Sequence, residues 1–189
     1  MDFENQIKDW IKNDLEKMEA LQTASTLHLN DWCIAAGFVR NLVWDKLHKL
    51  VWDKLHKKES LTPLHDVDLI YYDPTNPSEE PDKLIERHLN SISTLPWSVK
   101  NQARMHLRNC DKPYTSTCDA MSYWVEIETA VGVTLSMRGE IEILAPFGIA
   151  MLFENSITIN NKRRKANDFY ERIKKKQWLL QWPNLKVSA

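Results

Sequence analysis

The chain has few cysteines, almost no net charge and no long apolar run. Its three cysteines, Cys33, Cys110 and Cys118, are an odd number at spacings unlike those of a zinc site, so we interpret them as reduced, packing thiols. A formal net charge of −1 gives no general attraction to nucleic acid or to a membrane surface. No segment approaches the ~20 apolar residues of a membrane span. The acidic, amphipathic N-terminus does not resemble a secretory signal. These absences favour a cytoplasmic protein.

What the chain does contain is enough apolar material for one core. Its 189 residues are 43% hydrophobic and include eight tryptophans, which fits a single domain over residues 1–189. Apolar residues at helical spacing predict an N-terminal helix over Phe3–Leu21, within residues 1–28 and capped by Asp2. Residues 162–189 are expected to form a basic helix followed by a tryptophan-rich tail that folds back onto the body.

Two carboxylates lie in the segment predicted to be the central strand, residues 66–72. Side chains alternate across a strand, so Asp66 and Asp68 share one face, roughly 6.5–7 Å apart along the chain. Carboxylates at this spacing can jointly hold a divalent metal, and Mg²⁺ (or Mn²⁺) suits a site completed by water and phosphate oxygens. The same residues could also be ordinary solvated carboxylates.

A second short apolar segment precedes this strand. Residues 32–36 are expected to form a strand that stops at Gly37, with a helix beginning near Phe38. A glycine there lets the backbone approach a phosphate, and the helix N-terminus offers free N–H groups. The alternative is a simple turn glycine. Arg40, in the first turns of the helix, could contact phosphate or pair with a carboxylate. We favour the second role.

Four motifs carry a family resemblance. Residues 35–45 read AAGFVRNLVWD, residues 66–73 read DVDLIYYD, residues 100–106 read KNQARMH and residues 145–148 read APFG. In this order they resemble a small bacterial nucleotidyltransferase-like family of the DNA polymerase β-type nucleotidyltransferase superfamily. The first two motifs are also similar to those of tRNA CCA-adding enzymes. Ala36 and Asn41 depart from the superfamily pattern, which usually has Gly and Asp there.

The resemblance implies a fold and a set of site residues. The expected fold is α+β, a polymerase β-like nucleotidyltransferase core with a small mixed sheet and flanking helices. Asp66 and Asp68 would be metal ligands and catalytic residues. The superfamily also needs a third carboxylate on a neighbouring strand. Glu126 is our choice, with Glu142 as its competitor in the same apolar–acid–apolar setting.

The expected nucleotide contacts come from two regions: Gly37, Phe38, Arg40, Lys100 and Arg104. The segment 100–109 is unusually polar, although an ordinary exposed helix or edge strand would look the same. The basic segment 161–176 also has two interpretations. It is either a solvated helix that balances acidic residues elsewhere, or a surface that holds nucleotide phosphate or RNA backbone.

The sequence also contains an octapeptide twice. LVWDKLHK occupies residues 42–49 and again residues 50–57, which we interpret as a tandem duplication. Eight residues turn a helix by roughly 80° beyond two full turns, so the second copy cannot continue the buried stripe of the first. We expect one copy to pack and the surplus to be accommodated toward residues 57–63.

Three functions are compatible with these patterns. The first is a metal-dependent nucleotidyltransferase that moves a nucleoside monophosphate from a nucleoside triphosphate to a small-molecule or protein hydroxyl. Because the chain ends soon after the expected core, a nucleic-acid acceptor is the less favoured alternative. The second is a catalytically weak or inactive nucleotide-binding module of the same fold, which Ala36 and Asn41 favour. The third is a scaffold protein without a site.

Overall fold

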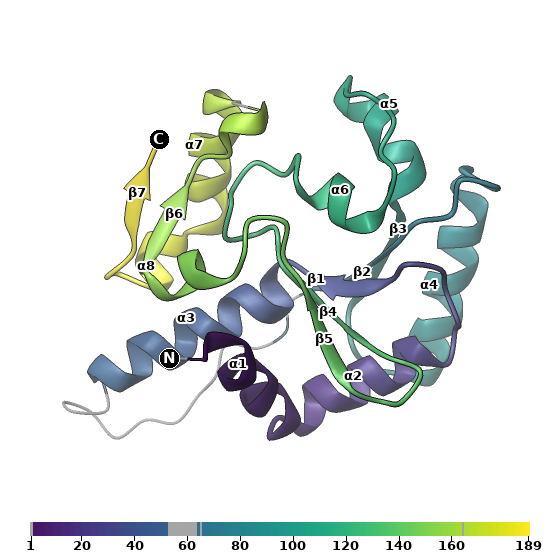
Figure 1. Cartoon of the computed structure of the whole chain (residues 1–189), viewed down its shortest axis with the longest axis horizontal. Coiled ribbons are helices and arrows are strands. Elements are labelled where there is room, and N and C mark those ends of the chain that lie inside the picture. Colours follow the sequence, from purple (N-terminus) through teal and green to yellow (C-terminus); the bar gives the residue numbers. More distant parts are fainter. Residues whose placement is uncertain (1, 53–63, 65, 164) are drawn as a thin grey trace.

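The structure, a computed structural model, describes residues 2–52, 64, 66–163 and 165–189, apart from the side chains of residues 49–52. Its centre is a five-stranded sheet in the order β3–β2–β1–β4–β5 (Figure 1). The strands are β1 (Cys33–Ala35), β2 (Val67–Tyr71), β3 (Trp97–Asn101), β4 (Gly132–Leu135) and β5 (Ile141–Leu144). β2 and β3 run parallel, and all other neighbours are antiparallel. The sheet is therefore mixed and the fold is α+β, as predicted.

The two faces of the sheet have different roles because side chains alternate along each strand. Leu69 of β2 lies in the main core, whereas Ile70 belongs to a smaller cluster on the opposite face. Asp68 shares the face of Ile70. The parallel register places Ser98 of β3 beside Asp68 and Lys100 beside Ile70. The second face therefore carries polar side chains where the first carries the core.

Four helices enclose the main core. They are α1 (Phe3–Lys12), α2 (Leu15–Ser25), α3 (Gly37–Trp52) and α4 (Glu80–Ile92). The single helix predicted over residues 3–21 is in fact two helices. Asp14 accepts a hydrogen bond from the backbone N–H of Lys17 and starts α2, just as Asp2 caps α1 through Asn5. The Asp2 cap is confirmed. The break between α1 and α2 was not predicted, because apolar residues continue at helical spacing across it.

Short elements connect the strands, and one of them packs on the main core through Leu152 and Phe153. They are η1 (Gln102–Arg104), α5 (Met105–Asn109), α6 (Thr117–Met121), η2 (Ala150–Phe153) and η3 (Asn161–Arg163). Ser116 caps α6 by accepting from the N–H of Asp119, and β4 and β5 form a hairpin with Gly139 at φ +76°. None of the helices in the described part of the chain is long and apolar enough to cross a membrane.

The C-terminal segment forms a second layer beside the sheet. It contains β6 (Ser156–Thr158), α7 (Ala166–Lys176), α8 (Trp178–Gln181) and β7 (Lys186–Ser188), with β6 and β7 paired in parallel (Figure 1). Trp178 and Trp182 are buried in a cluster with Phe169 and Ile173 of α7 and with Trp44 of α3. The tryptophan-rich tail thus folds back onto the body, as predicted.

The first copy of the octapeptide holds this tail in place. Trp44 is fully buried, with its ring 5.1 Å from that of Trp182. Asp45 Oδ1 accepts a hydrogen bond from Trp182 Nε1 at 2.8 Å, and His48 Nε2 accepts one from the backbone of Asn184 at 3.2 Å. The first copy therefore packs. In the second copy, residues 53–57 and the side chains of residues 50–52 lie outside what the structure describes, and so does the segment 57–63.

Candidate active site

The two aspartates of the expected site lie at the start of β2, which begins one residue later than predicted. Asp68 is in β2 on the second face of the sheet, and Asp66 immediately precedes the strand with 47% of its side chain exposed. Burial raises the pKa of Asp68 above its usual range, and the negative charge of Asp66 raises it further. Lys176, Arg40 and a hydrogen bond from Ser98 act in the opposite direction. Asp66 and Asp68 are two residues apart at the start of β2, which brings their negative charges near each other.

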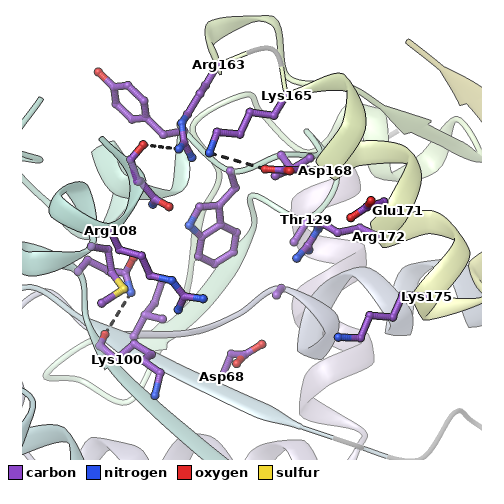
Figure 2. A pocket seen from close by; sticks show the side chains of 18 residues that line it. Asp68, Lys100, Arg108, Thr129, Arg163, Lys165, Asp168, Glu171, Arg172 and Lys175 are labelled. Atoms are coloured by element: carbon purple, nitrogen blue, oxygen red, sulfur yellow. Dashed lines mark hydrogen bonds and ion pairs between the residues drawn. The ribbon is translucent and has the colours of Figure 1, made fainter. Parts of the chain in front are cut away.

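Asp68 lies in an open cleft of about 620 Å³ over the second face. Figure 2 shows Lys100 and Arg108 on one side of Asp68 and Lys175 of α7 on the other. The cleft has a cationic lining of six side chains: Lys100, Arg108, Arg163, Lys165, Arg172 and Lys175. Three acidic side chains, Asp68, Asp168 and Glu171, also line it. Three of the six cations, Arg163, Lys165 and Arg172, form ion pairs with Asp111, Asp168 and Glu126. Lys100, Arg108 and Lys175 form none with the described residues, so they are the cations most available to a phosphate.

Most of these cations were not among the predicted site residues. Only Lys100 was named, whereas Arg108, Arg172 and Lys175 come from segments whose orientation the sequence left open. The basic run at residues 161–176 was the available signal. Because α7 lines the cleft, its phosphate-binding interpretation gains support over that of a purely solvated helix.

The N-terminus of α3 opens into the same cleft. Ala36 lines the cleft and has φ +57°, and it accepts helical hydrogen bonds from Val39 and Arg40. The left-handed residue is thus Ala36 and not Gly37, which is the first residue of α3. A Cβ on Gly37 would lie 3.2 Å from Asn41 Nδ2. Glycine is therefore favoured there by limited side-chain space.

Phe38 does not present its side chain to the cleft. It is fully buried in the main core, with Lys17 Nζ 4.6 Å from the ring centroid. Only the backbone N–H of Phe38 remains as a candidate nucleotide contact, as one of the first N–H groups of a helix. The sequence indicated the helix start correctly but not the direction of this side chain.

Arg40 is buried behind the cleft wall. Its Nη1 donates to Thr129 Oγ1 at 2.7 Å and its Nη2 to Asn41 Oδ1 at 2.8 Å. The guanidinium also stacks on Trp178, 4.5 Å from the ring centroid. Burial lowers its pKa to about 10, and the charge of Glu126 acts in the opposite direction. We expected Arg40 to pair with a carboxylate. Among the described residues this expectation is wrong, because the hydrogen-bond partners of Arg40, Thr129 and Asn41, are neutral.

Glu126 is separated from the acidic pair. Its carboxylate is 1% exposed and receives two bonds from Arg172, Nε to Oε1 at 2.7 Å and Nη2 to Oε2 at 3.2 Å. It forms only an isolated bridge with Ile159 and lies outside the five-stranded sheet. Its competitor Glu142 is exposed on the edge strand β5. The structure brings neither glutamate into the acidic pair.

The structure places Lys100 and Arg104 in different surroundings. Lys100 lines the cleft, whereas Arg104 lines a neighbouring cavity of about 690 Å³ that Lys100 and Arg108 also border. Arg104 pairs with the buried Asp82, which also accepts from Tyr71 Oη at 2.7 Å and from the backbone N–H of Asn101 at 3.0 Å. Burial, followed by this bond to Asp82, raises the pKa of Tyr71. These contacts give Arg104 a structural role in joining η1 to α4.

Asp66 and Asp68 can supply two of the ligands of a Mg²⁺ ion. Among the described residues, no three His, Cys, Asp or Glu side chains converge as a metal cage. Mg²⁺, however, is commonly bound by one or two carboxylates together with water and substrate phosphates. Asp66 and Asp68 supply such a pair beside a cleft that suits phosphates. Lys176 Nζ, 3.5 Å from Asp66 Oδ2, balances part of their charge.

Comparisons with known proteins agree with this fold. A family model for nucleotidyltransferases matches residues 22–50 and 47–187, so that residues 47–50, at the junction of the octapeptide copies, are matched twice. No curated protein sequence matches the chain. An NMR structure described as revealing a CCA-adding enzyme head domain is 30% identical, with a TM-score of 0.81 over 98% of this chain and 96% of that one.

More distant structures share only the fold. A tRNA-processing enzyme in complex form is 16% identical, with a TM-score of 0.53, over 89% of this chain and 43% of that chain. Its apo form gives the same identity and TM-score over 89% of this chain and 44% of that one. The family match extends over most of the present sequence, and the head-domain structure covers nearly all of it. The chain therefore belongs to the nucleotidyltransferase family and has the polymerase β-like fold of a CCA-adding enzyme head domain.

Proposed function

We propose that the protein transfers a nucleoside monophosphate from a nucleoside triphosphate to a hydroxyl group of a small molecule or protein, in the presence of Mg²⁺ or Mn²⁺. The observation that carries this proposal is the position of Asp68 in a cleft bordered by six cationic side chains and by the N-terminus of α3. Acidic residues attract the metal, whereas the cations and the helix terminus attract the phosphates. Both are needed to hold a metal-bound triphosphate.

The cleft supplies two kinds of phosphate contact. Lys100 and Arg108 on one side, and Arg172 and Lys175 on the other, can neutralise the triphosphate from opposite walls. The backbone N–H groups of Gly37 and Phe38 precede the first helical hydrogen bond of α3 and lie at the positive end of the helix dipole. Fixed donors of this kind stabilise charge as it develops on the leaving pyrophosphate.

Asp66 and Asp68 are the proposed Mg²⁺ ligands. When bound there, the ion would neutralise phosphate charge and make the α-phosphorus more susceptible to attack. The acceptor oxygen would form a bond to that phosphorus as the bond to pyrophosphate breaks, and the hydroxyl proton would pass to solvent. Arg40 holds Thr129 at the cleft wall, and Glu126 holds Arg172, so we assign these two charged groups positioning roles.

A nucleotide-binding module with little or no catalysis is the second candidate. The ion pair between Lys176 and Asp66 favours the binding module, because Lys176 already neutralises part of the negative charge that a metal ion would otherwise neutralise. The lack of a third carboxylate beside the pair, among the described residues, favours it too. This candidate predicts the same metal-dependent binding but no transfer.

A transfer assay separates the two candidates. The protein would be incubated with Mg²⁺ and each nucleoside triphosphate labelled at the α-phosphate, with hydroxyl-bearing small molecules, serine- and tyrosine-containing proteins, or RNA as separate acceptors. Covalent transfer with equimolar pyrophosphate release, lost in Asp68→Asn, supports the proposal. Metal-dependent binding without pyrophosphate release in any arm supports the binding module. Label transfer confined to RNA would overturn the proposed acceptor class but not nucleotidyl transfer.

A further inference from the structure

Trp124 has a fixed position beside α6. Its backbone N–H donates to the carbonyl of Met121 at 3.0 Å, and its own carbonyl accepts from Asn160 Nδ2 at 2.8 Å. Asn160 is buried, and its backbone N–H donates to the carbonyl of Val125 at 2.9 Å. The backbone of Trp124 and that of Val125 are thus tied to other elements. Little conformational freedom of this backbone would be lost when a ligand binds.

The indole lies between the core and the cleft. It is half-buried against the cluster of the second face, which includes Ile70 and Met121, and it also lines the cleft that contains Asp68. Part of the ring is therefore supported by the protein while the rest borders open space. An indole supported in this way at a cleft wall can contact a flat ligand.

Within the described part of the chain, the cleft side of this ring has no polar partner. Its N–H donates to no described residue, whereas that of Trp182 donates to Asp45. Nor is it among the fully buried, unpaired indole N–H groups, which belong to Trp44 and Trp97. The polar edge of Trp124 therefore remains accessible to a ligand.

No described cation lies over this ring either. Lys162 is placed over the neighbouring Tyr123, 3.8 Å from its centroid, and Arg40 stacks on Trp44 and Trp178. The cations of the cleft wall thus leave the Trp124 surface open for a flat, uncharged group, while they themselves suit phosphates.

We propose that Trp124 is the platform on which the nucleobase of the bound nucleoside triphosphate stacks. This inference rests on the proposed function and assigns its base-binding subsite. A base presents a flat aromatic surface with polar edges, which matches the indole. Base–aromatic stacking tolerates different bases because each has a π-face. The side chain therefore contributes affinity for any nucleoside triphosphate, and the phosphates are held separately by the cationic walls.

The test compares nucleotide with inorganic triphosphate. Binding of the tightest of ATP, GTP, CTP and UTP, and of inorganic tripolyphosphate, would be measured by calorimetry with Mg²⁺ in the full chain. The variants are Trp124→Leu, Trp124→Phe and, as a control outside the cleft, Tyr170→Leu, whose side chain is exposed on α7. Thermal unfolding of each variant verifies that it folds.

We expect Trp124→Leu to weaken nucleotide binding by about 5- to 140-fold, the range that corresponds to loss of one stacked base. Tripolyphosphate binding should stay unchanged, Trp124→Phe should retain most of the nucleotide affinity, and Tyr170→Leu should behave as wild type. Unchanged nucleotide affinity in folded Trp124→Leu overturns the inference while leaving the proposed function intact. An equal loss of affinity for nucleotide and for tripolyphosphate in folded Trp124→Phe also overturns the inference. Failure of the wild-type protein to bind either ligand overturns the proposed function and this inference together.

Discussion

Arg172 on α7 forks over the buried carboxylate of Glu126, with Nε 2.7 Å from Oε1 and Nη2 3.2 Å from Oε2. One helical turn later, Lys176 lies 3.5 Å from Asp66. Residues four apart share a face of a helix, so one face of α7 contacts two of the three carboxylates that the family resemblance suggested as catalytic. The two contacts differ, because Glu126 is fully enclosed whereas Asp66 remains half exposed. Glu126 therefore orients Arg172, and Asp66 stays accessible.

This relationship predicts different outcomes when Glu126 or Asp68 is replaced by its uncharged amide. Glu126→Gln should weaken nucleotide binding about 3- to 10-fold, since loss of one charge-assisted hydrogen bond loosens Arg172, but binding should still require Mg²⁺. Asp68→Asn should instead abolish the Mg²⁺-dependent nucleotide binding itself. Calorimetric titrations with and without Mg²⁺ measure both. If Glu126→Gln abolished the metal dependence as completely as Asp68→Asn, Glu126 would be a metal ligand after all.

Substitutions of Lys100 and Arg104 should have different effects on stability and on nucleotide binding. Arg104→Ala removes one partner of the buried pair with Asp82, and we expect it to lower the free energy of unfolding by about 3 kcal/mol. Lys100→Ala should leave the urea midpoint nearly unchanged and weaken nucleotide binding roughly tenfold, as expected for one phosphate contact. A stable Arg104→Ala protein with impaired nucleotide binding would instead restore the original nucleotide-binding role of Arg104.

Asp68 predicts a pH-dependent stability difference. Its folded pKa is raised, first by burial and then by Asp66, so the folded state binds this proton more tightly than the unfolded chain. The stabilisation that results is present at low pH and is lost as the pH rises through the raised pKa. Asp68→Asn should therefore be more stable than wild type at pH 7, and the difference should shrink as the pH falls toward the ordinary carboxyl range. Urea unfolding at several pH values measures this, and a less stable variant at pH 7 would refute it.

The octapeptide repeat leads to a deletion experiment. The described tail contacts of the repeat come from Trp44, Asp45 and His48 of the first copy. A variant that lacks residues 50–57 should consequently keep its cooperative thermal transition and bind nucleotide with Mg²⁺ as the full chain does. As a control, Trp44→Ala should cost about 3–5 kcal/mol, as for other buried aromatic residues. An unfolded deletion variant would show that the second copy is needed for the fold.

The local parts of the fold could be predicted because they depend on short-range patterns. The alternation around Asp68 predicted β2. The break at Asp14 was missed because apolar periodicity continued across a strong helix cap. The cationic wall could not be predicted, since it depends on tertiary packing that places Lys176 beside Asp66, 110 residues away in sequence. The same applies to Glu126, whose strand-like pattern gives only one bridge.

The most direct test of the central claim is calorimetric binding of nucleoside triphosphates with and without Mg²⁺, in the wild-type protein and in the Asp66→Asn/Asp68→Asn double variant. Our account predicts that the wild-type protein binds at least one nucleoside triphosphate only with the metal present. It also predicts that the folded double variant loses this metal-dependent binding. Binding that needs no metal and is equally tight in the double variant would contradict a metal-dependent nucleotidyltransferase site at Asp66 and Asp68.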